Sequence, residues 1–394
     1  MNHTLSILPI VEESTTENPA VAVQNPFIKQ LAIVFLEMLL AVPFGFCLTK
    51  LHLGGMAWLF GGVAAGTVVL QGCRIFYQYS PKPNRTARKI GMALVGLTVG
   101  ASTNYSDLAT VANGIPIFVL LTFFLLICGT VIGYIYSRLS QTNLLTSMLA
   151  TVPGGVGVMA SIAADYNKNV TLVALVQALR VTTVVLLIPF IVRTTVGNAW
   201  NPSIIPTPSN LFNFDISQLG LLLLVLGIIG LIVYLSILFK IPAGDFFGAL
   251  LIGIGFNPII NLLPFVQDIH FTPPSFINII GQMLLGITIG EYWGEKPSFG
   301  KRTIVYAVLS VIMTLIAGAI AAILAMQLTS WDWLTCLLVT APGGAAEMIL
   351  VSLVLNHNVE VVTTGHLIRL IAINSSLPIW LFLFRHLDGQ LSLK

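Results

Sequence analysis

Long runs of apolar residues alternate with short polar stretches along most of the chain. A helix that crosses the hydrocarbon core of a bilayer needs about 20 mostly apolar residues. By this criterion the pattern predicts twelve hydrophobic segments, at residues 30–50, 53–72, 88–104, 114–138, 142–165, 169–193, 216–239, 241–265, 276–293, 303–328, 333–356 and 359–385. The sequence therefore predicts an all-α polytopic membrane protein.

Two polar stretches lie outside these segments. Residues 1–28 contain Glu but no Lys or Arg, so they lack the basic start of a signal peptide, and we expect a cytoplasmic tail. Residues 194–215 are rich in Pro, Asn, Ser and Thr, which is typical of a linker. The two membrane parts would then be residues 29–193 and 216–386.

Composition excludes several other classes of protein. Only 8% of the 394 residues are charged, 56% are hydrophobic, and the net charge is +3. A soluble domain has about 25% charged residues, and a nucleic-acid binder needs a basic face that this chain lacks. The four Cys are scattered without the spacing of metal ligands. The sequence shows neither a catalytic triad nor a phosphate loop, so we expect no enzyme, no metal and no cofactor.

An internal repeat divides the chain into two halves. Residues 90–100 (IGMALVGLTVG) and residues 280–290 (IGQMLLGITIG) are identical at six of eleven positions. Residues 151–155 (TVPGG) match residues 340–344 (TAPGG), and the same register then pairs Arg180 with Arg369. Each half is therefore a duplicated module of six hydrophobic segments.

The distribution of Lys and Arg favours one orientation of the modules. If all twelve segments cross the membrane, Lys240, Lys301 and Arg302 fall outside, against the positive-inside rule. If the two Pro-Gly-Gly segments instead enter and leave on the same side, most Lys and Arg are cytoplasmic. We therefore expect two inverted repeats of five transmembrane helices plus one re-entrant Pro-Gly-Gly hairpin each. Both termini would be cytoplasmic.

The duplicated Pro-Gly-Gly motifs are the first candidates for a binding site. Pro removes a helix hydrogen bond, and tandem Gly frees the backbone to turn. Broken segments at matching positions of two repeats are typical of a transport site. A simple helix kink is the alternative. The candidate residues are Pro153, Gly154, Gly155, Pro342, Gly343 and Gly344.

Arg180 and Arg369 lie near the centres of apolar segments, where a cation is costly and needs a partner. A guanidinium facing the interior suits a carboxylate or a similar anion. A structural ion pair with Glu37 or Glu347 is the alternative, and both interpretations can hold in different states.

Three further residues are candidates for coupling to an ion. Glu37, Glu347 and His366 are intramembrane groups without an equivalent in the other half, and a buried Glu or His can carry a proton. For His366, a hydrogen-bonded helix-packing role is equally compatible with the sequence. The Asn pairs after the hairpins (Asn167, Asn169, Asn356 and Asn358) are typical of turns and caps. The glycines flanking Thr98 and Thr288 favour close helix packing.

The repeated Pro-Gly-Gly motif, followed by Asn-x-Asn-Val and a helical Arg, resembles the AbrB-type integral membrane family with its AbrB duplication domain. The similarity spans residues 30–385. The resemblance implies conflicting activities, because members are labelled either regulators of gene expression or ammonia monooxygenases. Neither a DNA-reading module nor a set of metal ligands is visible in this chain. The five-span repeats also resemble those of antiporter-like carriers, but only at the level of the fold.

These features together favour a secondary active transporter in the plasma (inner) membrane. We expect a small anionic organic solute, coupling to H⁺ or Na⁺, and alternating access around the two hairpins. Membrane lipid is an expected partner and nucleic acid is not. Homodimerisation, common among such carriers, is left open by the sequence. The alternative is a membrane-embedded sensor or regulator that affects gene expression through a partner; a channel and an enzyme fit less well.

Overall fold

The computed structural model describes residues 26–391 except for residues 51–53, 79–80, 82, 104–110, 112–113, 197–218, 240, 263–270, 293–298 and 356. Of the regions expected from the sequence, nearly all of the tail and most of the linker lie outside this described part. The parts that remain contain the repeats and both Pro-Gly-Gly motifs.

All regular structure in the described part is helical. The first half contains α1 (Pro26–Lys50), a 3-10 turn η1 (Gly54–Met56), α2 (Ala57–Tyr77), α3 (Arg85–Ser102), α5 (Ile115–Ser140), α6 (Leu144–Thr151), α7 (Val156–Asp165) and α8 (Val170–Val196). The second half contains α10 (Leu219–Leu238), α11 (Gly244–Asn261), α12 (Ser275–Glu291), α13 (Lys301–Leu328), α14 (Trp333–Thr340), α15 (Ala345–Val354) and α16 (Val359–Leu391).

Eight of the described helices are long and apolar enough to cross a membrane: α1, α2, α5, α8, α10, α11, α13 and α16. Helices α3 and α12 are shorter or more polar and occupy equivalent places in the two halves. The predicted apolar segments thus appear as helices close to the expected bounds. Each Pro-Gly-Gly segment is divided into two short helices, α6 with α7 and α14 with α15.

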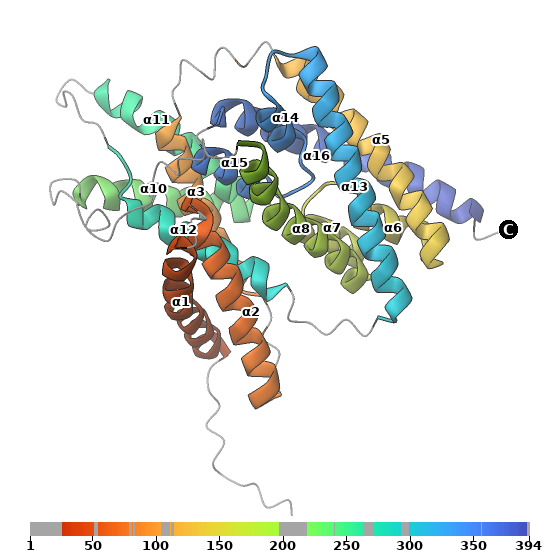
Figure 1. Cartoon of the computed structure of the whole chain (residues 1–394), viewed down its shortest axis with the longest axis horizontal. Coiled ribbons are helices and arrows are strands. Elements are labelled where there is room, and N and C mark those ends of the chain that lie inside the picture. The colour runs from red at the N-terminus through yellow and green to blue at the C-terminus, as the bar shows by residue number, and fades with distance from the viewer. Residues whose placement is uncertain are drawn as a thin grey trace, which may run out of the picture.

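Helices of each half pack against helices of the other half, and we call these the exchanged contacts. Helix α2 packs on α12 of the other half, and its repeat equivalent α11 packs on α3. With α1 and α10 these helices form what we call the scaffold bundle. Helices α5–α8 and α13–α16 form the core bundle, in which α5 packs on its equivalent α13. Figure 1 shows scaffold helices α10–α12 to the left and core helices α5, α6 and α13 to the right.

The exchanged contacts are close because glycines line them. A Cβ added to Gly96 would overlap the Phe246 carbonyl oxygen, and one added to Gly286 would overlap that of Leu59. This confirms the close packing that the glycine spacing predicts. The α2–α12 crossing and the α3–α11 crossing are equivalent in the two halves, and glycines make both of them close.

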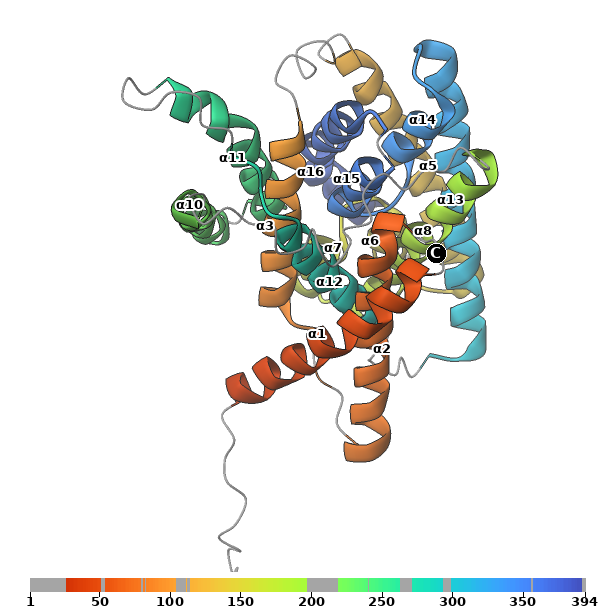
Figure 2. The same cartoon turned by 60° about the vertical axis from the view of Figure 1, so that its left-hand side comes forward.

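The largest apolar cluster joins the scaffold bundle to the core bundle. Val95 and Leu285 of the scaffold pack there with Val184, Met348 and Ile349 of the core. Helix α15 of the second broken segment lies at this junction, since it contacts both α3 and η1. In Figure 2, α15 lies between α3 and α13, with α10 and α11 at the outer edge.

Candidate functional site

Each broken segment is anchored to a long neighbouring helix by a threonine just before its Pro-Gly-Gly motif. The Thr151 hydroxyl oxygen lies 2.9 Å from the Gly129 carbonyl oxygen of α5. The Thr340 hydroxyl oxygen lies 3.0 Å from the Gly318 carbonyl oxygen of α13. These bonds hold the ends of α6 and α14 against the core bundle, so the two breaks have the same setting.

Arg180 of α8 reaches the first break. Its Nη1 donates to the Thr151 carbonyl oxygen at 3.0 Å, and its Nη2 donates to Gln177 Oε1 at 2.6 Å. The Thr151 carbonyl is one of the groups that the end of α6 leaves without a helical partner. Arg180 is only 2% exposed, and its buried Nε has no hydrogen-bond partner. One donor of this guanidinium is therefore unused.

Arg369 of α16 repeats this arrangement at the second break. Its Nη1 donates to the Ala341 carbonyl oxygen at 2.8 Å, and its Nη2 lies 3.4 Å from the Gly343 carbonyl oxygen. The same Nη2 lies 2.6 Å from His366 Nδ1. Each arginine therefore binds the backbone next to its own Pro-Gly-Gly motif.

Gln177 and His366 occupy equivalent positions and make equivalent bonds. Gln177 accepts from Arg180 and donates through Nε2 to the Leu149 carbonyl oxygen at 2.9 Å. His366 Nε2 lies 3.0 Å from the Leu338 carbonyl oxygen. Since arginine can only donate, His366 Nδ1 must accept, and Nε2 carries the proton. Both ring nitrogens are occupied, which favours the helix-packing interpretation of His366.

The two arginines bring positive charge to one place without a carboxylate partner. The guanidinium groups of Arg180 and Arg369 are near enough to repel each other electrostatically. No ion pair within 4.0 Å joins either arginine to a carboxylate in the part of the chain that the structure describes, whereas Asp332 and His357 do form such a contact. The structure therefore forms neither of the ion pairs, with Glu37 or with Glu347, that the sequence left open. Two buried cations with only neutral partners favour binding of an anion.

Glu347 lies in the first turn of α15, directly after the second Pro-Gly-Gly motif. Its carboxylate is folded against Gly344, where an added Cβ would overlap it. The side chain is 2% exposed, and its buried Oε2 has no hydrogen-bond partner. Arg88 and Tyr292 of the scaffold bundle lie within electrostatic range. Glu347 thus belongs to the site and faces its scaffold side.

Glu37 is not brought to the arginines. It lies in α1, which contacts α2 and α12, and Glu291 at the end of α12 lies within electrostatic range of it. Glu37 is fully buried and neither carboxylate oxygen has a partner, whereas Glu291 accepts from the Asn84 backbone N–H at 2.9 Å. This acidic pair lies on scaffold helices, whereas Arg180, Arg369 and Glu347 lie on core helices.

Sequence reasoning missed Glu291, Arg88 and Tyr292 as functional candidates. Each lies at the end of an apolar segment, where a charged or aromatic residue is common at the membrane interface. The Arg88 guanidinium lies 5.8 Å from the centre of the Tyr292 ring. No local sequence signal reports this approach, because the two residues are about 200 positions apart.

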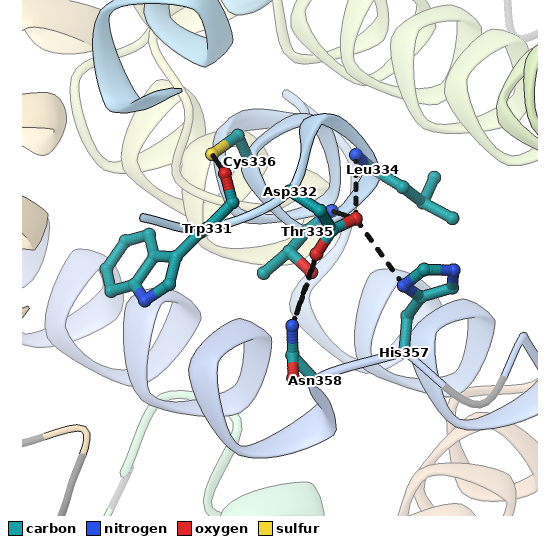
Figure 3. Close-up of polar contacts among 7 residues, drawn as sticks. All are labelled: Trp331, Asp332, Leu334, Thr335, Cys336, His357 and Asn358. Carbon is teal, nitrogen blue, oxygen red and sulfur yellow. Dashed lines mark hydrogen bonds and ion pairs between the residues drawn. The ribbon is translucent and has the colours of Figure 1, made fainter. Parts of the chain in front are cut away.

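A cluster of polar residues joins the two ends of the second broken segment (Figure 3). Asp332 accepts from the backbone N–H groups of Leu334 and Thr335 at 3.1 and 3.2 Å, and so caps α14. Asn358 Nδ2, which follows α15, donates to Asp332 Oδ1 at 3.2 Å, and His357 Nδ1 lies 3.5 Å from Asp332 Oδ2. The chain therefore enters and leaves this segment at one point.

Asp332 lies in the turn before α14. Its partial burial acts to raise its pKa, but hydrogen bonds from Thr335 and the nearby His357 outweigh burial, so the pKa falls below its ordinary value.

In the first half, Asn169 accepts from the Leu172 N–H at 3.0 Å, and Asn167 has a left-handed φ of 50°. These asparagines are turn and cap residues, as the sequence predicts.

The two broken segments differ in burial. Every described residue of α15 is buried or half-buried, whereas Gly157, Ser161, Ala164 and Asp165 of α7 are exposed. Helix α15 packs on the scaffold, and α7 contacts mainly α6 and α8. The second broken segment is therefore covered, whereas the first is exposed along α7.

Comparison with known proteins agrees with the family resemblance. The family model described as "Transition state regulatory protein AbrB" matches residues 58–385. The chain is 30% identical over 319 residues to "Uncharacterized protein YhjN" of Bacillus subtilis (strain 168), covering 78% of this chain and 81% of that protein. It is 26% identical over 296 residues to "Putative regulator AbrB" of Escherichia coli (strain K12), covering 73% and 80%.

Proposed function

Since the chain belongs to the AbrB family, whose description specifies no substrate, we propose from the site that it is a secondary active transporter of a small organic anion. The observation that carries this proposal is the pair of buried guanidiniums, Arg180 and Arg369, beside two broken helices and without a carboxylate partner. A small anion would compensate their charge. An anion that binds both arginines would also contact both halves.

The geometry of the broken segments supports re-entrant hairpins. Helices α14 and α15 have 8 and 10 residues, which gives lengths of about 12 and 15 Å at 1.5 Å per residue. Neither length crosses a hydrocarbon core of about 30 Å. The bond between Asp332 and Asn358 brings both ends of the segment to the same point. A hairpin that returns to its side of entry accommodates these facts.

The exchanged helix contacts support an inverted relation between the repeats. A two-fold axis converts the α2–α12 contact into the α11–α3 contact. An axis in the membrane plane inverts one half relative to the other and agrees with the placement of Lys and Arg. Alternating access then follows from movement of the core bundle against the scaffold bundle. The plasma membrane and cytoplasmic termini belong to the same proposal, as does a homodimer.

Glu347 is the residue best placed to couple transport to an ion. Its unpartnered Oε2 lies next to the second Pro-Gly-Gly motif and within electrostatic range of Arg88 on the scaffold. Binding H⁺ or Na⁺ there would alter the attraction between the two bundles. Glu37 is a second candidate, because its oxygens are buried and unpartnered, but its site is remote from the arginines.

The proposal is tested by reconstituting the full chain in liposomes and measuring uptake of small carboxylates under imposed H⁺ or Na⁺ gradients. We expect uptake of at least one carboxylate, loss of that uptake in Arg369→Gln, and loss of the ion dependence in Glu347→Gln. Circular dichroism and thermal unfolding establish that each variant is folded. Absence of uptake of any organic anion under every gradient would overturn the proposal.

A membrane-embedded regulator of gene expression remains the second candidate, since the family description and the name of the Escherichia coli relative both refer to regulation. Affinity capture with residues 1–28 as bait favours this candidate if it yields a specific cytoplasmic partner. If expressing the chain changes transcription, and expressing the Arg369→Gln variant causes the same change, then the regulation does not depend on transport.

A further inference from the structure

Each break in the core bundle is packed against both of the helices that carry the arginines. At the second break, a Cβ added to Gly343 would lie 3.0 Å from Val184 Cγ1 of α8. At the first break, Val152 belongs to one small apolar cluster with Leu126 and with Ile373 of α16. Val184 and Ile373 are equivalent in the repeat, and each follows the arginine of its helix by four residues. Since residues four apart share one face of a helix, each arginine lies on the face that meets the break of the other half.

This packing brings two positive charges together. The guanidinium groups of Arg180 and Arg369 lie near enough to repel each other. Their hydrogen-bond partners are all neutral, namely three backbone carbonyl oxygens and the side chains of Gln177 and His366. Within the described part of the chain, the two buried cations therefore share a region without a carboxylate in contact with either.

The two guanidinium groups also have unused donors. An arginine has five N–H donors. Arg180 makes two hydrogen bonds and Arg369 makes three, so half of their N–H donors have no partner among the described residues. One of the unused donors, Nε–H of Arg180, is buried. Because buried donors are seldom left without a partner, these donors indicate a bound ligand or water.

We propose that the pair of arginines binds a dianion, a small aliphatic dicarboxylate, with one carboxylate at each guanidinium. The inference rests on the proposed function and specifies its substrate. A monocarboxylate would leave one buried cation without a counter-charge, whereas a dianion balances both. Each guanidinium is held at its own break. Two separated carboxylates therefore match the site better than one compact dianion such as sulfate.

The first test compares ligands that differ by one carboxylate. Full-length protein in detergent is titrated near pH 7, at constant ionic strength, with malonate, succinate and glutarate. Propionate, butyrate and valerate are their monocarboxylate counterparts, sulfate is the compact dianion, and the rise in Tm gives an apparent affinity for each. We expect the best dicarboxylate to bind about tenfold or more tightly than its counterpart, because it makes additional charge-assisted hydrogen bonds. Sulfate should bind more weakly than that dicarboxylate.

The second test removes one of the two cations. In Arg180→Gln only Arg369 remains, so affinity for the best dicarboxylate should fall about tenfold or more, while affinity for its monocarboxylate counterpart should change by less than about threefold. Arg180→Lys keeps the charge and should retain part of the preference. Arg138→Gln is the matched control, because it makes the same substitution at an exposed arginine of α5. It should bind both classes of ligand as the unmodified chain does.

The inference is overturned if no dicarboxylate raises the Tm, if monocarboxylates or sulfate bind as tightly as the best dicarboxylate, or if Arg180→Gln loses affinity for both classes equally. The comparison of ligands on the unmodified chain does not depend on the folding of any variant. Binding with the expected preference but without uptake of any organic anion by liposomes would contradict the transporter proposal alone. Uptake of monocarboxylates only would contradict this inference alone.

Discussion

Two different side chains perform one task at the scale of the residue. Gln177 and His366 each accept a hydrogen bond from an arginine and donate one to the backbone of a short helix. The amide of Gln and the neutral imidazole of His offer an acceptor and a donor in similar directions. The sequence identified both arginines and left the role of His366 open, since the alignment of repeats gives positions but not bond directions.

His366→Gln should therefore preserve the setting of Arg369. We expect its thermal stability and the pH profile of its uptake to match those of the unmodified chain. His366→Phe should unfold at a lower temperature, since unpaired buried groups each cost about 1–3 kcal/mol. If His366→Gln instead removes the pH dependence of uptake, His366 is a proton carrier and the matched roles are wrong.

At the scale of the element, the lengths of the apolar runs predicted the helices well, and the sequence correctly located both breaks. Apolar run length determines where a helix can lie in lipid, and Pro-Gly-Gly determines where it must end. The charged contact of Arg88 with Tyr292 escaped prediction because it depends on how α3 and α12 cross. The sequence also did not show the contact at the start of α14, where Asp332 both caps the helix and accepts a hydrogen bond from Asn358.

The Asp332 cap predicts a specific dependence of stability on pH. Its folded-state pKa is below its ordinary value, so ionised Asp332 stabilises the fold above the unfolded pKa of about 3.9. That contribution is lost as the pH falls through the lower, folded pKa. Asp332→Asn should be less stable near neutral pH and should lose less stability on acidification. Thermal unfolding between pH 3 and pH 7 measures both effects, and parallel curves for the two proteins would contradict this role.

At the scale of the whole molecule, duplication produces helix contacts that are exchanged between halves, together with a site that is not symmetric. The exchange follows from the repeat, because equivalent glycines make equivalent crossings. The asymmetry comes from single positions, such as Glu347 opposite Val158, and from burial of α15 where α7 is open. Aligning the two halves of the sequence revealed that these positions differ. The difference in burial could be seen only once the bundles were placed in space.

The open face of α7 consists largely of small residues, among them Gly157, Ser161 and Ala164. Their equivalents in α15 include Leu350, which is buried, and Leu353, which packs on the main apolar cluster. In the proposed transport cycle this surface would be wetted in one half and dry in the other, so it would have to suit both water and close packing. Small, uncharged side chains satisfy both requirements.

Ala164→Trp makes that requirement measurable. The indole would meet open space in the structure as it stands, so the variant should fold, at a cost of about 0.5 kcal/mol from lower helix propensity. In the proposed transport cycle this face closes once per turnover, so uptake should nevertheless stop because the indole would block the closure. Leu231→Trp, at an exposed site on α10, should transport normally. Normal uptake by Ala164→Trp would mean that this face does not close, and that the small size of its side chains has no part in transport.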